Sequence, residues 1–374
     1  MSPLKFIWGL LFRLFPCPVA VGLRRIGSPD RSSPILVTCN FYLTVRRLSK
    51  ALKGRNVWLL VAGSKGVNVW CAAGAEEFNT RSVVSVVKTS EIGRKVDHRR
   101  LILPPLGAPG ICARTVHEQT GWKILWGPVR CRDIPRFLDR HMRRDETMKR
   151  VTYDWRERLD TGLGALFVFY LSGALGFTLF GRHLLIDYLL IAAGAFVFFM
   201  STCPWLPGRR GLTKVLFLAS LPALGLVINE IRDYPLWPSA RADMIIALTM
   251  LFVYGSELGG LSATMSSDLD PLLARLGIGT VGNVALAGTV RTELLNGYRI
   301  LRYDEKLCVG CGSCIEVCPR GVWEAGPTNR AVLAHREKCT ACRACLVQCG
   351  TGAIKAEKKE IPGRAGAVGS GRFL

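Results

Sequence analysis

Two identical cysteine runs near the C-terminal end constrain this chain more than any other feature. Both runs have the spacing C-x2-C-x2-C-x3-C, and Pro319 follows the first of them. This spacing lets three thiolates surround one cubane iron–sulfur cluster while the fourth cysteine ligates the other cluster. The sequence therefore predicts two [4Fe-4S] clusters with crossed ligands. The first set is Cys308, Cys311, Cys314 and Cys349, and the second set is Cys339, Cys342, Cys345 and Cys318.

Two other interpretations of these cysteines are less consistent with the pattern. The chain has 14 cysteines, and such a number in a secreted protein can indicate disulfides. Zinc is the competing metal, but zinc sites rarely use two such tight runs. Iron–sulfur chemistry instead implies a reducing compartment. We therefore expect residues 301–374 to form an α+β dicluster ferredoxin domain that transfers one electron at a time.

The middle of the chain is apolar. Although the chain has 50 Lys and Arg residues, 49% of its residues are hydrophobic, and its mean hydropathy is +0.24. Residues 161–181 contain no charged residue and are long enough to span the ~30 Å hydrocarbon core of a bilayer. We therefore expect residues 160–262 to be an α-helical transmembrane domain of about four spans. The expected spans are 161–181, 183–203, 211–229 and 242–262.

Basic residues predict the orientation of these spans. The 204–214 loop holds three basic residues, whereas the 181–183 turn holds one. Basic loops stay in the cytoplasm, so an even number of spans puts both soluble domains on the cytoplasmic side of an inner membrane. Residues 263–300 would be the Gly-rich linker to the ferredoxin domain. Such loops also explain the net charge of +22, and we expect membrane contact but no nucleic-acid binding.

The N-terminal part of the chain has a mixed pattern. Helical patterns separate four short apolar runs, which are residues 35–38, 57–62, 101–103 and 124–126. Strands that alternate with helices predict a Rossmann-like α/β domain, here residues 31–150, with a parallel sheet between helices. Residues 1–30 are expected to be an interfacial amphipathic segment, because their apolar run is short and is interrupted by Lys5 and Arg13.

A candidate site follows the second predicted strand. A Gly-bearing turn at 63–66 leads to Asn68, a residue type that caps helices, and Ala72 and Ala73 favour a helix. Ligands of open α/β sheets bind at such carboxyl ends of strands. Cys71 would lie in the first helical turn, where the helix dipole lowers the pKa of a thiol. From these residues alone, an ordinary buried cysteine remains the alternative.

Residues 68–74 (NVWCAAG) resemble the cap-helix signature of HgcA, the corrinoid protein family of microbial mercury methylation. Further similar segments are 37–41 (VTCNF), 98–104 (HRRLILP), 106–110 (LGAPG) and 127–130 (GPVR). A membrane helical domain follows in that family too. Its partner, HgcB, is a small ferredoxin with two such cysteine runs. This chain therefore resembles a fusion of the two proteins.

The resemblance implies a cofactor and a reaction. Residues 31–150 would bind a base-off corrinoid, with Cys71 as the catalytic residue and the lower axial ligand of cobalt. The methyl group would come from a methyl-donor protein of one-carbon metabolism and would pass to Hg(II). The ferredoxin domain, supplied by an unknown electron donor, would return cobalt to Co(I). The cofactor-binding residues would be Asn68, Val69, Trp70, Cys71, Ala72, Ala73 and Gly74.

Two departures from the family pattern leave other functions open. Ala75 stands where the family has a lysine, and Glu76 and Glu77 replace small residues of the family. No cysteine follows Cys349, whereas the family's ferredoxin usually ends in a cysteine pair. These departures favour a corrinoid methyltransferase with a different acceptor in one-carbon metabolism. A third hypothesis, from a different class, is a membrane electron-transfer ferredoxin whose N-terminal domain binds no corrinoid.

Overall fold

Continuous apolar runs form the centre of the α/β domain. β2 (Ile35–Cys39) and β3 (Val57–Ala62) are buried at every position, as expected for strands that helices cover on both faces. β4 (Arg100–Leu103) and β5 (Lys123–Trp126) complete a parallel sheet with them, so the predicted mixed α/β fold is confirmed. The computed structural model describes residues 3–12, 15–151, 154–202, 205–206, 216–220, 223–224, 227, 242–251, 298–339 and 342–358.

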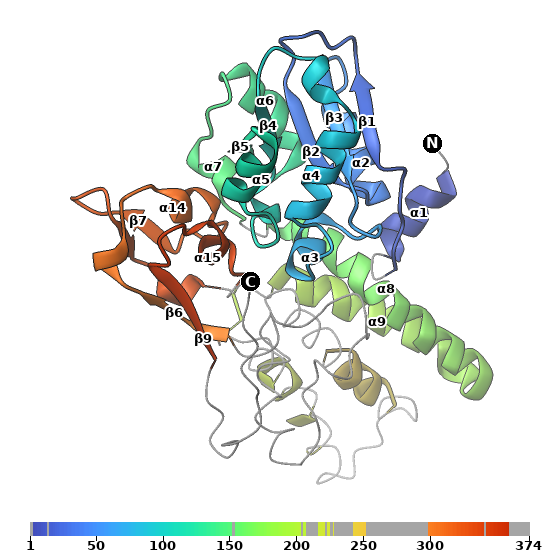
Figure 1. Ribbon diagram of the computed structural model, residues 1–374. Helices are drawn as coiled ribbons and strands as arrows, with labels where there is room; N and C mark the ends of the chain where they lie inside the picture. Colours follow the sequence, from blue (N-terminus) through green and yellow to red (C-terminus); the bar gives the residue numbers. More distant parts are fainter. Residues whose placement is uncertain are drawn as a thin grey trace, which may run out of the picture.

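Helices cover both faces of this sheet (Figure 1). α4 (Thr80–Thr89) and α5 (Ala113–Thr120) share one buried core with alternate side chains of β2 and β3. α2 (Tyr42–Ala51) and α6 (Ile134–Asp139) share a second core with the other side chains of the same strands. The two cores therefore lie on opposite faces of one sheet. The remaining short helices of this domain are α3 (Val69–Gly74) and α7 (Glu146–Lys149).

β1 (Gly22–Ile26) is a strand that the sequence pattern does not reveal. It pairs antiparallel with β3 at the edge of the sheet, which has the order β1-β3-β2-β4-β5. Its sequence is GLRRI, and edge strands tolerate charged side chains. The α/β domain therefore begins within residues 1–30, which were expected to be interfacial only. α1 (Pro3–Leu11) precedes β1 and packs against α2 and against the long helix α8 (Trp155–Phe180).

Two long apolar helices, α8 (Trp155–Phe180) and α9 (Leu185–Thr202), follow the α/β domain. Within the described residues, the helical stretch Arg182–Thr202 is long and apolar enough to cross a membrane. α8 is a second candidate if its two halves, bent by 51°, are counted as one span. Apolar core helices share this length and composition, so the predicted multi-pass domain remains a prediction. The predicted spans at 211–229 and 242–262 lie mostly outside the described residues.

The cysteine-rich domain is built from two similar halves. Its helices α14 (Ser313–Val317) and α15 (Ala344–Gln348) each follow a residue with left-handed backbone, Gly312 (φ 72°) and Arg343 (φ 65°). Glycine adopts this conformation without the steric cost that an arginine has there. The strands pair antiparallel, β6 with β9 and β7 with β8. These strands are β6 (Tyr298–Tyr303), β7 (Trp323–Ala325), β8 (Ala331–Leu333) and β9 (Ile354–Lys358), so the predicted linker 263–300 includes the start of β6.

Gln348, the last residue of α15, joins this domain to the α/β domain. Its Nε2 donates to the carbonyl oxygens of Ala108 at 3.0 Å and of Ile111 at 2.7 Å. Its Oε1 accepts a hydrogen bond from the backbone N–H of Ala113 at 3.2 Å. One side-chain amide thus pairs with three backbone groups at the start of α5, and Figure 1 shows α15 beside this part of the α/β domain.

A second contact lies at α14. The side chain of Arg144 is 5% exposed and forms an ion pair with Glu316 of α14 at 3.0 Å. Desolvation lowers the pKa of Arg144, and the carboxylate of Glu316 opposes that shift. The backbone N–H of Val151 donates to the carbonyl oxygen of Pro319 at 2.9 Å. Because a buried cation is costly without its partner, these contacts fix how α14 sits on the α/β domain.

Gln348→Leu should loosen this interface. The substitution removes three hydrogen bonds and leaves the N–H of Ala113 without its acceptor, at a cost of about 1 kcal/mol for each bond. Peptides that include Ala113 should exchange their amide hydrogens at least ~5-fold faster in hydrogen–deuterium exchange mass spectrometry. Gln119→Leu on the exposed side of α5 is the matched control. If both variants exchange as the unchanged protein does, Gln348 does not hold the interface.

Candidate functional site

The first predicted cysteine set is gathered in the small domain. Cys314 is buried at the start of α14 and interacts electrostatically with Cys308 and Cys311. Cys349 packs into the same buried cluster of side chains as Cys314. Burial raises the pKa of the Cys314 thiol to about 12. A thiolate at this position therefore requires positive charge beside it, which the iron of a cluster would supply.

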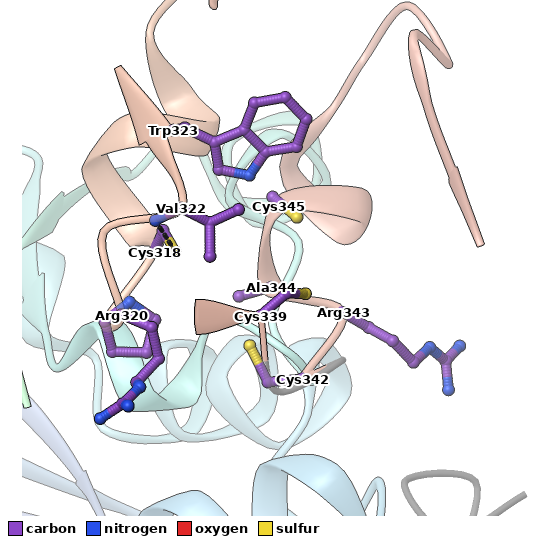
Figure 2. A pocket seen from close by; sticks show the side chains of 10 residues that line it. Cys318, Arg320, Val322, Trp323, Cys339, Cys342, Arg343, Ala344 and Cys345 are labelled. Carbon is purple, nitrogen blue, oxygen red and sulfur yellow. Dashed lines mark hydrogen bonds between the residues drawn. The ribbon is translucent and has the colours of Figure 1, made fainter. Parts of the chain in front are cut away.

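The second set surrounds a cavity (Figure 2). Cys318, Cys339, Cys342 and Cys345 all line one pocket. Burial is the largest cause of the raised pKa of Cys345, and the other three cysteines act on it as well. Cys318 comes from the first sequence run and the other three come from the second. The structure thus brings together the four cysteines that the crossed spacing groups.

Buried donors beside the sulfur atoms test whether these sites fit a cluster. The backbone N–H of Val322 donates to Cys318 Sγ at 3.4 Å. The indole N–H of Trp323 is buried and has no hydrogen-bond partner among the described residues. It lies close enough to Cys345 to lower the pKa of that thiol. Hydrogen bonds to sulfur tune iron–sulfur clusters. Thiol ligands with nearby N–H donors therefore fit an iron–sulfur cluster.

A single metal ion is a poorer description of the same cysteines. Within the described ranges, no three side chains among His, Cys, Asp and Glu converge on the position of one ion. The four cysteines of the second set instead line one pocket, which Figure 2 shows.

The predicted cap helix is α3, which begins after Asn68. The side-chain oxygen of Asn68 accepts a hydrogen bond from the N–H of Cys71 at 3.0 Å, the N-cap geometry that the sequence predicts. Val69, Ala72 and Ala73 are buried, and Cys71 is exposed. Enough protein surrounds Cys71 that desolvation raises the pKa of its thiol, and the hydrogen bond from Asn68 offsets only part of this. The expected lowering of this pKa by the helix dipole is therefore wrong.

Asn40 holds the loop that leads into α3. It follows β2 and is 7% exposed. Its Oδ1 accepts hydrogen bonds from the N–H and the hydroxyl of Ser64 and from the N–H of Gly66, each at 2.9 Å. Its Nδ2 donates to the carbonyl oxygen of Val19 at 3.2 Å. One buried amide thus fixes the turn between β3 and α3, and with it the position of Cys71.

A cleft lies beside α3, at the carboxyl ends of β2 and β4. Its cavity volume is about 350 Å³, within the ~300–1,000 Å³ of most small-molecule sites. β2 and β4 are neighbours between which the strand order reverses, and ligands of open α/β sheets bind at such switch points. Asn68, Val69 and Trp70 line the cleft, whereas Cys71 does not. An exposed thiol and this cleft therefore adjoin the same short helix, an arrangement that suits a ligand that carries a metal.

The turn η2 (Pro105–Gly107) connects this region to the cysteine sites. It contacts α3 as well as α14 and α15. The backbone that follows it approaches α3 so closely that a Cβ atom on Gly110 would overlap the carbonyl oxygen of Phe78 and lie 3.0 Å from that of Ala73. The helix of Cys71 and both helices of the cysteine-rich domain therefore share one neighbour.

Comparison with known proteins identifies the kind of each domain. Residues 14–138 match the family model of the CO dehydrogenase/acetyl-CoA synthase delta subunit, and residues 300–350 match that of a 4Fe-4S dicluster domain. The acetyl-CoA decarbonylase/synthase complex subunit gamma of Methanopyrus kandleri is 35% identical over 127 residues, which are 33% of this chain and 27% of that protein. The same subunit of Archaeoglobus fulgidus is 31% identical over 131 residues, which are 34% of this chain and 27% of that protein.

A third relative is named for its cofactors. The corrinoid/iron–sulfur protein large subunit of Moorella thermoacetica is 28% identical over 124 residues, which are 33% of this chain. This chain carries a domain similar to corrinoid/iron–sulfur proteins and a 4Fe-4S dicluster domain. The chain spans 27% of the length of each of these relatives. The predicted corrinoid and 4Fe-4S chemistry is thus supported at the level of families, and mercury methylation stays a prediction.

Some site residues carried no usable signal in the sequence. Gln348 and Arg144 matter because two domains meet at them, and neither lies in a motif. Trp323 is one of nine tryptophans in the chain, and only its burial beside Cys345 sets it apart. Asn40 did lie in a segment that resembles the corrinoid family, so its importance could have been inferred from residues 37–41.

Asn40→Ala should destabilise the α/β domain and release the loop before α3. Three donors on Ser64 and Gly66 lose their buried acceptor, and leaving buried groups unpaired costs about 1–3 kcal/mol. Thermal unfolding should shift to lower temperature, and amides of residues 63–67 should exchange faster. Asn56→Ala is the control, because Asn56 accepts only an exposed hydrogen bond from the N–H of Ser28. Equal effects of the two substitutions would argue against this role of Asn40.

Cys318→Ala should remove the second cluster and leave the first. Cys318 lines the cavity with the three cysteines of the second run, although it belongs to the first run in sequence. Electron paramagnetic resonance of the reduced, reconstituted protein should show one [4Fe-4S] signal in place of two interacting ones. Cys112→Ala, outside both sets, should keep both signals. Selective loss of the cluster held by Cys308, Cys311 and Cys314 would refute the crossed grouping.

Proposed function

We propose that this chain is a corrinoid-dependent methyltransferase fused to its own iron–sulfur reductase. The observation that carries this proposal is that η2 contacts both the helix of Cys71 and the two helices of the dicluster domain. One chain thus holds a corrinoid-type domain and a one-electron donor against each other. A membrane ferredoxin without a corrinoid gives no reason for this arrangement.

The roles of the chain's residues follow from their positions. A bound corrinoid would supply a cobalt atom that carries the methyl group. Cys71, exposed on α3, would hold that cobalt as a thiolate ligand, and Asn68 would hold the first turn of α3 in place. Metal binding would also stabilise the deprotonated form of this thiol, whose pKa is raised in the metal-free protein. The cleft beside Asn68, Val69 and Trp70 would take part of the ligand and exclude water from it.

The dicluster domain would keep the methyl carrier active. The cysteine set of Cys308, Cys311, Cys314 and Cys349 would hold one cluster, and the set of Cys318, Cys339, Cys342 and Cys345 the other. Cys342 packs against the same core that contains α3 residues, so the second set lies nearest the proposed corrinoid site. Electrons would leave the dicluster domain across this contact, one at a time.

The acceptor proposed first is Hg(II), with the methyl group coming from a donor protein of one-carbon metabolism. The resemblance of residues 68–74 to the mercury-methylating family supports it. The second candidate is methyl transfer to another acceptor in one-carbon metabolism. The relatives named as acetyl-CoA decarbonylase/synthase subunits support this candidate. Glu77 also bears on the choice, because it departs from the mercury-family pattern and forms an ion pair with Lys65 at 2.8 Å beside α3.

We further propose that α8 and α9 attach the protein to the cytoplasmic membrane, with both soluble domains facing the cytoplasm. Large apolar side chains are exposed along both helices, for example Phe180 (91%), Ile186 (69%) and Leu190 (68%). Exposed apolar surface of this extent is typical of membrane or protein contact. The basic residues of the 204–214 loop give the orientation.

Cys71→Ala should abolish methyl transfer and leave both clusters intact. The cobalt would lose its ligand from the protein, so the visible and electron paramagnetic resonance spectra of the corrinoid-reconstituted protein should change. Methyl transfer should fall by more than about 100-fold, the upper end for residues that only support a metal ligand. The assay is anaerobic formation of methylmercury, run beside Cys112→Ala as a control. Transfer of the methyl group to another acceptor, without methylmercury formation, would favour the second candidate. If neither protein binds a corrinoid, the proposal is wrong.

A further inference from the structure

The two halves of the cysteine-rich domain share a backbone pattern but differ at two aromatic positions. α14 and α15 occupy the same place in their halves, each after a residue with left-handed backbone. Counted from the cysteine runs, Tyr303 in the first half corresponds to Ala334 in the second. Trp323 corresponds to Ile354 in the same way, and both of these residues are buried (0% and 4% exposed). The second half thus folds with apolar residues at both positions, so packing alone does not require the hydroxyl or the indole N–H.

Both aromatic side chains bury a polar atom. The hydroxyl of Tyr303 and the indole N–H of Trp323 are buried and have no hydrogen-bond partner among the described residues. In native proteins the large majority of buried polar side-chain atoms do have a partner. Each atom is a hydrogen-bond donor, so each fits an acceptor that would arrive with a cofactor. The sulfur atoms of an iron–sulfur cluster are such acceptors.

The two donors lie at different cysteine sets. Trp323 lines the pocket of the second set, and Figure 2 shows its nitrogen on the side of the ring nearest the cysteines. Burial raises the pKa of the Cys345 thiol, and the indole of Trp323 opposes this shift. At the first set, the hydroxyl of Tyr303 is the largest cause of the lowered pKa of Cys308. The two rings contact each other edge to face, with centroids 5.2 Å apart. One aromatic pair therefore presents one donor to each cysteine set.

We propose that Tyr303 and Trp323 set the reduction potentials of the two clusters separately, Tyr303 by donating to sulfur at the first cluster and Trp323 by donating to sulfur at the second. Reduction adds one electron to a cluster, and the added negative charge is shared with its sulfur atoms. A donor to sulfur stabilises the reduced form more than the oxidised form and so raises the potential. No bond breaks and no proton is transferred. Both residues act on iron through sulfur and are therefore positioning residues.

This inference rests on the proposed function only in that the two cysteine sets hold clusters. The test uses the full-length protein in detergent, with clusters reconstituted and no corrinoid added. A redox titration with dithionite, followed by electron paramagnetic resonance, gives the potential of each cluster. Cys318→Ala, which should keep only the first cluster, shows which signal belongs to which cluster.

Trp323→Phe should lower the potential of the second cluster and leave that of the first unchanged. At a fixed applied potential, the ratio of reduced to oxidised second cluster should fall by about tenfold, or about 59 mV for one electron. Tyr303→Phe, which removes only a hydroxyl, should have the same effect on the first cluster alone. Trp205→Phe, at a residue that is 80% exposed outside the dicluster domain, should change neither potential.

A second variant separates the lost donor from the lost volume of the indole. Benzothienylalanine at position 323 keeps both fused rings and has sulfur in place of the N–H, so it should lower the second potential as Trp323→Phe does. If Trp323→Phe loses its cluster, this variant decides. Unchanged potentials with intact clusters would overturn the proposal, and equal shifts of both clusters in each variant would contradict separate action. The corrinoid takes no part in this readout, so failure of the methyl-transfer proposal would be seen separately.

Discussion

The close approach of the loop after η2 to α3 is the constraint on which the arrangement of both sites depends. Gly110 has no room for a side chain, because Phe78 and Ala73 present their backbone oxygens to it. That approach places η2 between α3 and the two helices of the dicluster domain. The same stretch of chain also contains the backbone groups with which Gln348 forms hydrogen bonds. A single backbone segment therefore positions the helix of Cys71 and the cysteine sites relative to each other.

Ion pairs connect the cleft to the apolar helices in a similar way. Arg130 and Glu157, with 13% and 26% of their side chains exposed, form a pair between the α/β domain and the first turn of α8. Arg47 and Asp160 form another at 2.7 Å. The Arg47–Asp160 pair is the more exposed of the two, and exposed pairs contribute only about 0–1 kcal/mol, so its main effect is on position. All four residues line the cleft. Whatever fixes α8, such as a membrane, therefore also fixes one wall of the cleft.

The sequence predicts a structural feature correctly where one local segment determines that feature by itself. The buried strands are continuous apolar runs, the N-cap at Asn68 is local, and the cysteine spacing repeats over a few residues. It was uninformative where the outcome depends on distant segments. β1 carries two arginines and is a strand only because the edge of β3 is available. The raised pKa of Cys71 reflects the protein around α3, which outweighs the helix dipole on which the sequence argument relied.

Fusion of the two domains changes how strong their contact has to be. The described interface combines polar contacts, such as the Gln348 amide and the Arg144–Glu316 ion pair, with apolar packing of Val317, Ala344 and Cys342 against the core of the α/β domain. The polar contacts contribute only about 1 kcal/mol each. Within one chain the partner is always present, at an effective concentration that the connecting segment sets. A weak contact is then enough to hold the dicluster domain against η2 most of the time. In the proposed function, opening of this contact would let a methyl donor reach α3 between rounds of electron transfer.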